Sequence, residues 1–264
     1  MATNISPLAH VDPSAKIGDN VTIHPFAFID ADVEIGDGTE IMSYTSIIRG
    51  TRIGRDNKIY QGSIIGADPQ DFRWTGCKTY CYVGDKNVIR EHVIINRGIT
   101  SEGGTRIGSE SFIMAETHIG HDTVVADHCV LGNGVTIAGD ASVGTCSILS
   151  SGVILHEKST LGAWTLIKGG CRISGNVPPF VIMAHNPASY FGVNAVVLRK
   201  GGFTDEEVDD IAKAYRHIYQ TGTSVFNALK RIEADLKPSR VREAIIDYIR
   251  GCNLKIVAIP RDLE

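Results

Sequence analysis

Aliphatic residues recur at every sixth position over more than half of the chain. The steps run from Val11 to Ile65, from Val83 to Ile95 and from Ile107 to Ile173, all in one phase. A helix buries a residue every three to four positions and a half-buried strand every second one, so a step of six fits neither element alone. The pattern predicts a coil of short strands around one column of buried side chains.

Small residues accompany the repeated aliphatic residue. The next position is often glycine, as at Gly18, Gly36 and Gly54, and a small or β-branched residue such as Ala27 or Val33 lies four positions on. Glycine suits a tight bend between short strands. This is the hexapeptide pattern of a parallel β-helix. Three hexapeptides form one triangular coil, so residues 18 apart should stack at about the 4.8 Å spacing of strands.

Two polar segments, residues 66–82 and 96–106, interrupt the repeat. Each is rich in turn-forming residues, and we expect each to contain a loop that leaves the coil. Loops on a rigid scaffold often carry function.

The six-residue step ends near Val177, and helical spacing follows. Thr204 and Glu207 form a capping box, and a helix is expected from there to about Gly222. Further helices are expected over about 224–236 and 240–250. We therefore predict a mainly β protein with two domains. A parallel β-helix occupies residues 1–190, and a small C-terminal α-helical domain occupies residues 191–264.

Composition narrows the class of protein. A 264-residue chain with 43% apolar residues can bury a large core. A net charge of -4 does not favour a nucleic-acid binder. The sequence contains no run of about 18 apolar residues and no signal-peptide pattern, so no transmembrane segment and a cytoplasmic location are expected. The six cysteines include no Cys-x-x-Cys pair, and reduced thiols are expected.

Two histidines, His118 and His121, lie outside the aliphatic column and should point outward. Gly139 is 18 residues after His121, so a backbone N–H should lie about one strand spacing from the imidazole. A base beside an N–H that can stabilise an oxyanion suits acyl transfer, and Asp122 could orient the imidazole. His156 should lie two coils along the same edge.

These residues alone leave other interpretations open. An outward histidine on a β-solenoid can be an ordinary surface residue. A zinc site is the alternative known from hexapeptide carbonic anhydrases, but a catalytic zinc needs three ligands, and the neighbours here are aspartate and glycine. No metal is therefore expected.

A cluster of basic residues in the C-terminal part is either a solvated helix face or a patch for an acidic partner. It comprises Lys230, Arg231, Lys237, Arg240 and Arg242.

Several segments together resemble the UDP-N-acetylglucosamine O-acyltransferases of lipid A synthesis. They are HIGHD (118–122), IYQ (59–61), DPQDFRW (68–74), GDKNVIRE (84–91), NVPPF (176–180) and HNPASYFGVNAVVLRKGGF (185–203). The resemblance covers nearly the whole chain, and the last segment is its most specific part. It implies a left-handed β-helix, a homotrimer with clefts between subunits, acyl carrier protein as donor, UDP-N-acetylglucosamine as acceptor, and no cofactor.

The resemblance also implies roles for individual residues. His121 would be the general base, Asp122 its orienting partner, and the Gly139 amide the oxyanion donor. Asp71 matches a contact to the hydroxyl of an (R)-3-hydroxyacyl chain, and Asn194 matches a nucleotide contact. The other implied substrate-binding residues are Gln70, Arg73, His118, His156, Arg199 and Lys200, and Gly170 falls where the family sets acyl length.

Five positions depart from the pattern of the family. Arg73 replaces a lysine, Asn96 and Asp140 replace histidines, Glu157 replaces a glutamine, and Gly201 replaces a basic residue. The last change leaves open how the nucleotide diphosphate is bound.

Two other functions remain as alternatives. One is an N-acyltransferase acting on a nucleotide amino sugar, although such enzymes usually carry a preceding uridine-binding domain and the repeat here begins by residue 11. The other is a zinc-dependent hydratase or a non-catalytic scaffold.

Overall fold

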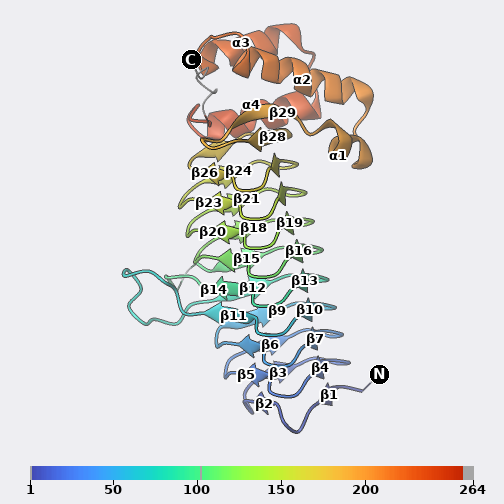
Figure 1. Cartoon of the computed structure of the whole chain (residues 1–264), viewed down its shortest axis with the longest axis vertical. Helices are drawn as coiled ribbons and strands as arrows, with labels where there is room; N and C mark the ends of the chain where they lie inside the picture. The colour runs from blue at the N-terminus through green and yellow to red at the C-terminus, as the bar shows by residue number, and fades with distance from the viewer. Residues whose placement is uncertain (1, 102, 258–264) are drawn as a thin grey trace.

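The computed structural model of the chain describes residues 2–101 and 103–257. Its larger part is a solenoid of short parallel strands, and its C-terminal part is a group of helices at one end of the solenoid (Figure 1). In the described residues the strands form three sheets, one on each face of a triangular prism. We call them the first, second and third sheets.

Consecutive strands belong to successive sheets, so each sheet contains every third strand. The first sheet contains β1 (Asn4–Ile5), β4 (Thr22–Ile23), β7 (Glu40–Ile41), β10 (Lys58–Ile59), β13 (Val88–Ile89), β16 (Phe112–Ile113), β19 (Val130–Leu131), β22 (Ile148–Leu149), β25 (Leu166–Ile167) and β28 (Val181–Ala184), and ends with the antiparallel β29 (Ser189–Val193). The second contains β2 (His10–Val11), β5 (Phe28–Ile29), β8 (Ser46–Ile47), β11 (Ile64–Ala67), β14 (Ile94–Asn96), β17 (His118–Ile119), β20 (Thr136–Ile137), β23 (Ile154–Leu155) and β26 (Arg172–Ile173). The third contains β3 (Lys16–Ile17), β6 (Glu34–Ile35), β9 (Thr51–Ile53), β12 (Cys81–Val83), β15 (Thr105–Ile107), β18 (Val124–Val125), β21 (Ser142–Val143), β24 (Thr160–Leu161) and β27 (Asn176–Val177).

The repeated aliphatic residues fill the interior of the prism, which confirms the prediction from the six-residue step. From Ile23 to Ile173 each of them is at most 4% exposed. Strand pairing keeps the register of 18, as where Ile119 lies beside Ile137 and Ile137 beside Leu155. Because every coil adds three residues to one continuous column, the hydrophobic effect stabilises the stack along its whole length.

Both interruptions of the repeat are loops. The first comprises residues 68–80 between β11 and β12 and extends away from the solenoid in Figure 1. The second lies between β14 and β15 and is described at residues 97–101 and 103–104. Across the first loop, the paired residues Ile65 and Ile95 are 30 apart instead of 18.

A buried arginine holds the base of the first loop. Arg97 is 6% exposed, and its guanidinium donates to the Gly66 carbonyl at 3.0 Å and to Thr79 Oγ1 at 3.1 Å. Its Nη2 also lies 2.6 Å from Asp68 Oδ1, and the guanidinium stacks 5.1 Å from the Trp74 ring. Since these contacts reach both ends of the loop, Arg97 fixes where the loop leaves the coil.

The C-terminal part contains α1 (Ala195–Lys200), α2 (Asp205–Tyr219), α3 (Val225–Asp235) and α4 (Arg240–Gly251). The capping box of Thr204 and Glu207 starts α2, so the three predicted helices and this cap are confirmed. Helix α1 was not predicted, because six residues are too few to show a helical period. The expected boundary at residues 190 and 191 lies within β29. No helix in the described ranges is long and apolar enough to cross a membrane.

The buried column predicts different effects for substitutions of two neighbouring valines. Val125→Ala leaves a cavity in the interior and should lower the free energy of unfolding by about 2 kcal/mol. Val124→Ala, one residue earlier on the outer face of β18, is the matched control and should change it by less than about 0.5 kcal/mol. Urea unfolding measures both, and equal losses would contradict the packing described above.

Candidate active site

His121 occupies the turn between β17 in the second sheet and β18 in the third. We call the stacked turns between these two sheets the His121 edge. The imidazole lies outside the aliphatic column, as predicted, but the residue is only 7% exposed. Nδ1 lies 3.0 Å from Asp122 Oδ2 and Nε2 lies 3.2 Å from Asp71 Oδ2. The first loop contacts the ring through Asp71, and the six-residue repeat did not predict this contact.

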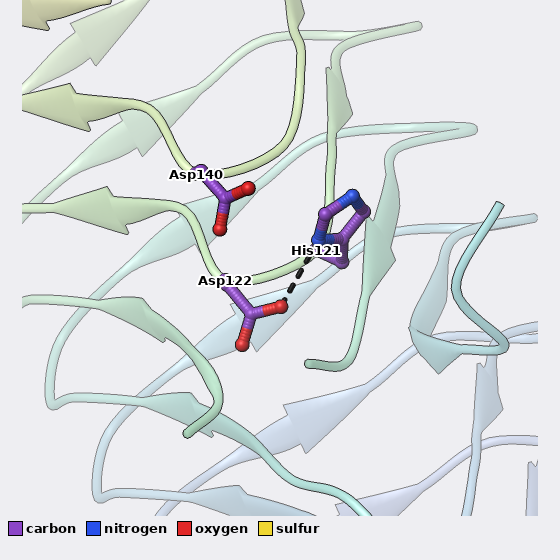
Figure 2. A group of neighbouring side chains, drawn as sticks. All are labelled: His121, Asp122 and Asp140. Atoms are coloured by element: carbon purple, nitrogen blue, oxygen red, sulfur yellow. Dashed lines mark hydrogen bonds and ion pairs between the residues drawn. The ribbon is translucent and has the colours of Figure 1, made fainter. Parts of the chain in front are cut away.

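Asp122 has a fixed position. Its backbone is in the left-handed region with φ 54°, and its N–H donates to Thr105 Oγ1 at 2.9 Å. Its Oδ2 accepts from the Ile99 N–H at 2.9 Å and faces His121, as Figure 2 shows. A carboxylate oxygen only accepts, so Nδ1 of the imidazole carries the proton of this bond. The second loop therefore orients Asp122, and Asp122 orients the ring.

Gly139 lies beside the imidazole, one coil beyond His121. A Cβ at this position would come 2.3 Å from His121 Nε2, so a side chain would displace the ring. In the described residues the Gly139 N–H donates no hydrogen bond, whereas the Asp140 N–H donates to the His121 carbonyl at 3.0 Å. The site thus combines an oriented imidazole with an unused N–H donor, which are the groups needed for attack on a carbonyl.

The first loop brings charge to the site through Asp71 and Arg73. Arg73 donates from its backbone N–H and from Nε to Asp71 Oδ1, at 2.7 and 3.0 Å, and its Nη2 lies 2.7 Å from Asp71 Oδ2. These bonds hold the pKa of Asp71 well below its usual range. Sequence reasoning did not predict that Asp71 would lie against His121, because the loop breaks the register of 18.

Three other predicted residues lie on or next to the His121 edge. His118 is on β17, half-buried, and burial lowers the pKa of its imidazole. His156 follows β23, two coils beyond His121, and is exposed. Gln70 is exposed on the first loop beside Asp71.

The remaining predicted residues lie away from the His121 edge. Asn194 is buried where α1 begins, and its Nδ2 donates to the Trp164 carbonyl at 3.4 Å, in the turn between the third and first sheets. Arg199 on α1 pairs with Asp205 at 2.7 Å, and Lys200 is exposed. Gly170, with φ 72°, lies in a turn between the first and second sheets. Within a single chain, these four residues do not lie beside His121.

His121, Asp122 and Asp140 are the one group in the described residues whose ligand atoms lie close enough together to hold a metal ion (Figure 2). Two of the three already bond to each other. The Arg73 guanidinium lies 3.5 Å from Asp140 Oδ2. A fixed positive charge at this distance opposes a second cation, so the arrangement suits acid–base chemistry better than metal binding.

Comparison with known protein families gives two informative matches. The family described as "Udp N-acetylglucosamine O-acyltransferase; Domain 2" matches residues 176–257. The family described as "Bacterial transferase hexapeptide (six repeats)" matches residues 104–139.

Curated relatives match almost end to end. Acyl-(acyl-carrier-protein) UDP-N-acetylglucosamine O-acyltransferase from Halorhodospira halophila is 38% identical over 94% of this chain and 96% of its own length. The protein of the same name from Xanthomonas euvesicatoria is 41% identical over 94% and 95%. Among solved structures, a UDP-N-acetylglucosamine acyltransferase from Bacteroides fragilis is 40% identical with a TM-score of 0.93, covering 97% of this chain and 99% of that one.

The bond from Ile99 to Asp122 yields a prediction. Asp122→Ala leaves the partly buried Ile99 N–H and the imidazole without their acceptor, which should lower the free energy of unfolding by about 1 kcal/mol. The Ile99 amide should exchange with solvent at least about tenfold faster, as measured by hydrogen exchange.

The control is Asp56→Ala, because Asp56 shares the left-handed conformation, with φ 55°, but its side chain makes no hydrogen bond in the described residues. An unchanged exchange rate at Ile99, or an equal loss in the control, would contradict the assigned bond.

Proposed function

The chain belongs to the UDP-N-acetylglucosamine O-acyltransferase family and is an acyltransferase, and from that premise we propose its reaction. It transfers an (R)-3-hydroxyacyl group from acyl carrier protein to the 3-hydroxyl of UDP-N-acetylglucosamine, the first step of lipid A biosynthesis. The observation that carries this proposal is the oriented pair of His121 and Asp122 beside the Gly139 N–H.

The proposed mechanism uses the atoms described above. The acceptor hydroxyl takes the place of Asp71 at His121 Nε2, which removes its proton as the oxygen attacks the thioester carbonyl. The Gly139 N–H stabilises the oxyanion of the tetrahedral intermediate. The carbon–sulfur bond then breaks, and the thiolate leaving group takes the proton from the imidazolium. Asp122 stabilises the imidazolium without being protonated.

Substrate contacts follow the family assignments. Asp71, fixed as a carboxylate by Arg73, accepts a hydrogen bond from the 3-hydroxyl of the acyl chain. Gln70, His118 and His156 line the cleft for the sugar and acyl groups. Asn194, Arg199 and Lys200 bind the nucleotide, and Gly170 leaves space for a long acyl chain.

The proposed assembly is a homotrimer of left-handed β-helices in the cytoplasm. The distribution of the assigned residues supports it, because His121, Asn194 and Gly170 lie on three different edges of the prism. A cleft between two copies would bring different edges together, which a single chain cannot do.

Docking of acyl carrier protein is proposed on the helical part, where an acidic partner would meet basic side chains. Arg240 is already paired with Glu207 at 2.6 Å, and the largely buried Arg242 donates to the Leu236 carbonyl at 2.9 Å. Three exposed cations then remain for the carrier protein: Lys230, Arg231 and Lys237.

The reaction can be tested directly. UDP-N-acetylglucosamine and a pool of 3-hydroxyacyl carrier proteins should yield a 3-O-acylated nucleotide sugar, identified by mass spectrometry. An acceptor with an amine in place of the 3-hydroxyl separates O-acyl from N-acyl transfer. Absence of product at every chain length, or preference for the amine, would refute the proposal.

His121→Ala tests the general base. The variant should lose about 10²- to 10⁴-fold in kcat, the usual contribution of a positioned base. His128→Ala is the control, since His128 shares the left-handed conformation but lies on another edge and pairs with Glu110. A rate near wild type in His121→Ala, or an equal loss in the control, would exclude this mechanism.

A further inference from the structure

Arg73, which departs from the family pattern, contacts two other residues that also depart from it. Arg73 Nη2 lies 3.5 Å from Asp140 Oδ2 and 3.7 Å from Glu157 Oε1. Of these positions, the resemblance assigns only that of Arg73 to substrate binding. The Arg73 guanidinium connects the other two side chains.

The three side chains come from separate parts of the fold. Arg73 is on the first loop, Asp140 follows β20, and Glu157 follows β23. The two carboxylates therefore belong to the two coils immediately beyond His121 along the His121 edge. The guanidinium spans these coils and connects the loop to the solenoid.

Few contacts hold the outer part of the first loop. Arg97 fixes its base, but in the described residues only two kinds of polar contact join residues 70–73 to the solenoid. One is the pair of Asp71 with His121, and the other is the pair of Arg73 with Asp140 and Glu157. Arg73 donates four hydrogen bonds of 2.7 to 3.2 Å to the Asp71 carboxylate, so the contacts that position the guanidinium also position that carboxylate.

We propose that Asp140 and Glu157 are positioning residues that dock the first loop through Arg73 and so set Asp71 beside His121. The proposal rests on the proposed function, in which Asp71 accepts a hydrogen bond from the acyl 3-hydroxyl. A site that hydrogen-bonds a substrate hydroxyl discriminates against the analogue that lacks it. Asp140 and Glu157 therefore determine, through Arg73, the selectivity for 3-hydroxyacyl over unsubstituted acyl donors.

The test compares Asp140→Asn, Glu157→Gln and the double variant with wild type. The measured quantity is the ratio of kcat/KM for a 3-hydroxyacyl carrier protein to that for the unsubstituted acyl carrier protein of equal length. The ratio should fall about two- to fivefold in each single variant, the range expected for partly exposed charge pairs. A general loss of structure would lower both rates and leave the ratio unchanged.

Two controls sharpen the result. Asp56→Asn removes a carboxylate from a turn of the same φ on another edge and should leave the ratio at the wild-type value. In the Asp71→Asn background, Asp140→Asn and Glu157→Gln should cause no further fall, because the residue through which they act is already lost. An unchanged ratio in the double variant, or a further fall in the Asp71→Asn background, would overturn the proposal.

Docking can also be measured without turnover. Hydrogen exchange of the peptides covering residues 68–78 should be faster in the double variant than in wild type and in Asp56→Asn. Unchanged exchange would exclude docking even if the enzyme is active. A wild-type protein that forms no product with any acyl donor refutes the proposed function instead, and the exchange experiment still decides the docking.

Discussion

The structure depends on one constraint, the closure of each coil in three short strands around a shared aliphatic column. A residue of the wrong size or polarity in that column would disturb the coils on both sides, because each coil is covered mainly by its neighbours. The constraint makes the solenoid a regular scaffold. Side chains at equivalent positions of successive coils lie at a fixed spacing along an edge.

The site combines the regular solenoid with the two loops inserted in it. The solenoid alone places His121 beside Gly139, whereas the second loop supplies the Ile99 N–H that holds Asp122. The first loop supplies Asp71 and Arg73. Buried Arg97 joins the two loops at their base, since it belongs to the start of the second and contacts both ends of the first. The insertions therefore supply groups of the proposed site that the regular repeat does not.

The sequence predicted what the repeat controls. The buried column, the capping box at Thr204 and the closeness of Gly139 to His121 all follow from counted spacings within uninterrupted segments. The contact of Asp71 with His121 does not, because the inserted residues have no fixed register. The contact of Ile99 with Asp122 was not predicted for the same reason, since Ile99 lies in an inserted loop. Helix α1 was missed since a stretch as short as AVVLRK carries no readable period.

The position of Asp71 has a consequence for timing. Asp71 Oδ2 lies 3.2 Å from His121 Nε2, at the position that the acceptor hydroxyl takes in the proposed reaction. While this carboxylate lies against Nε2, a water molecule cannot occupy the same position. In the proposed mechanism, Nε2 becomes available to the substrate when the acceptor hydroxyl displaces Asp71. That mechanism would protect a bound acyl thioester from hydrolysis until the acceptor is in place.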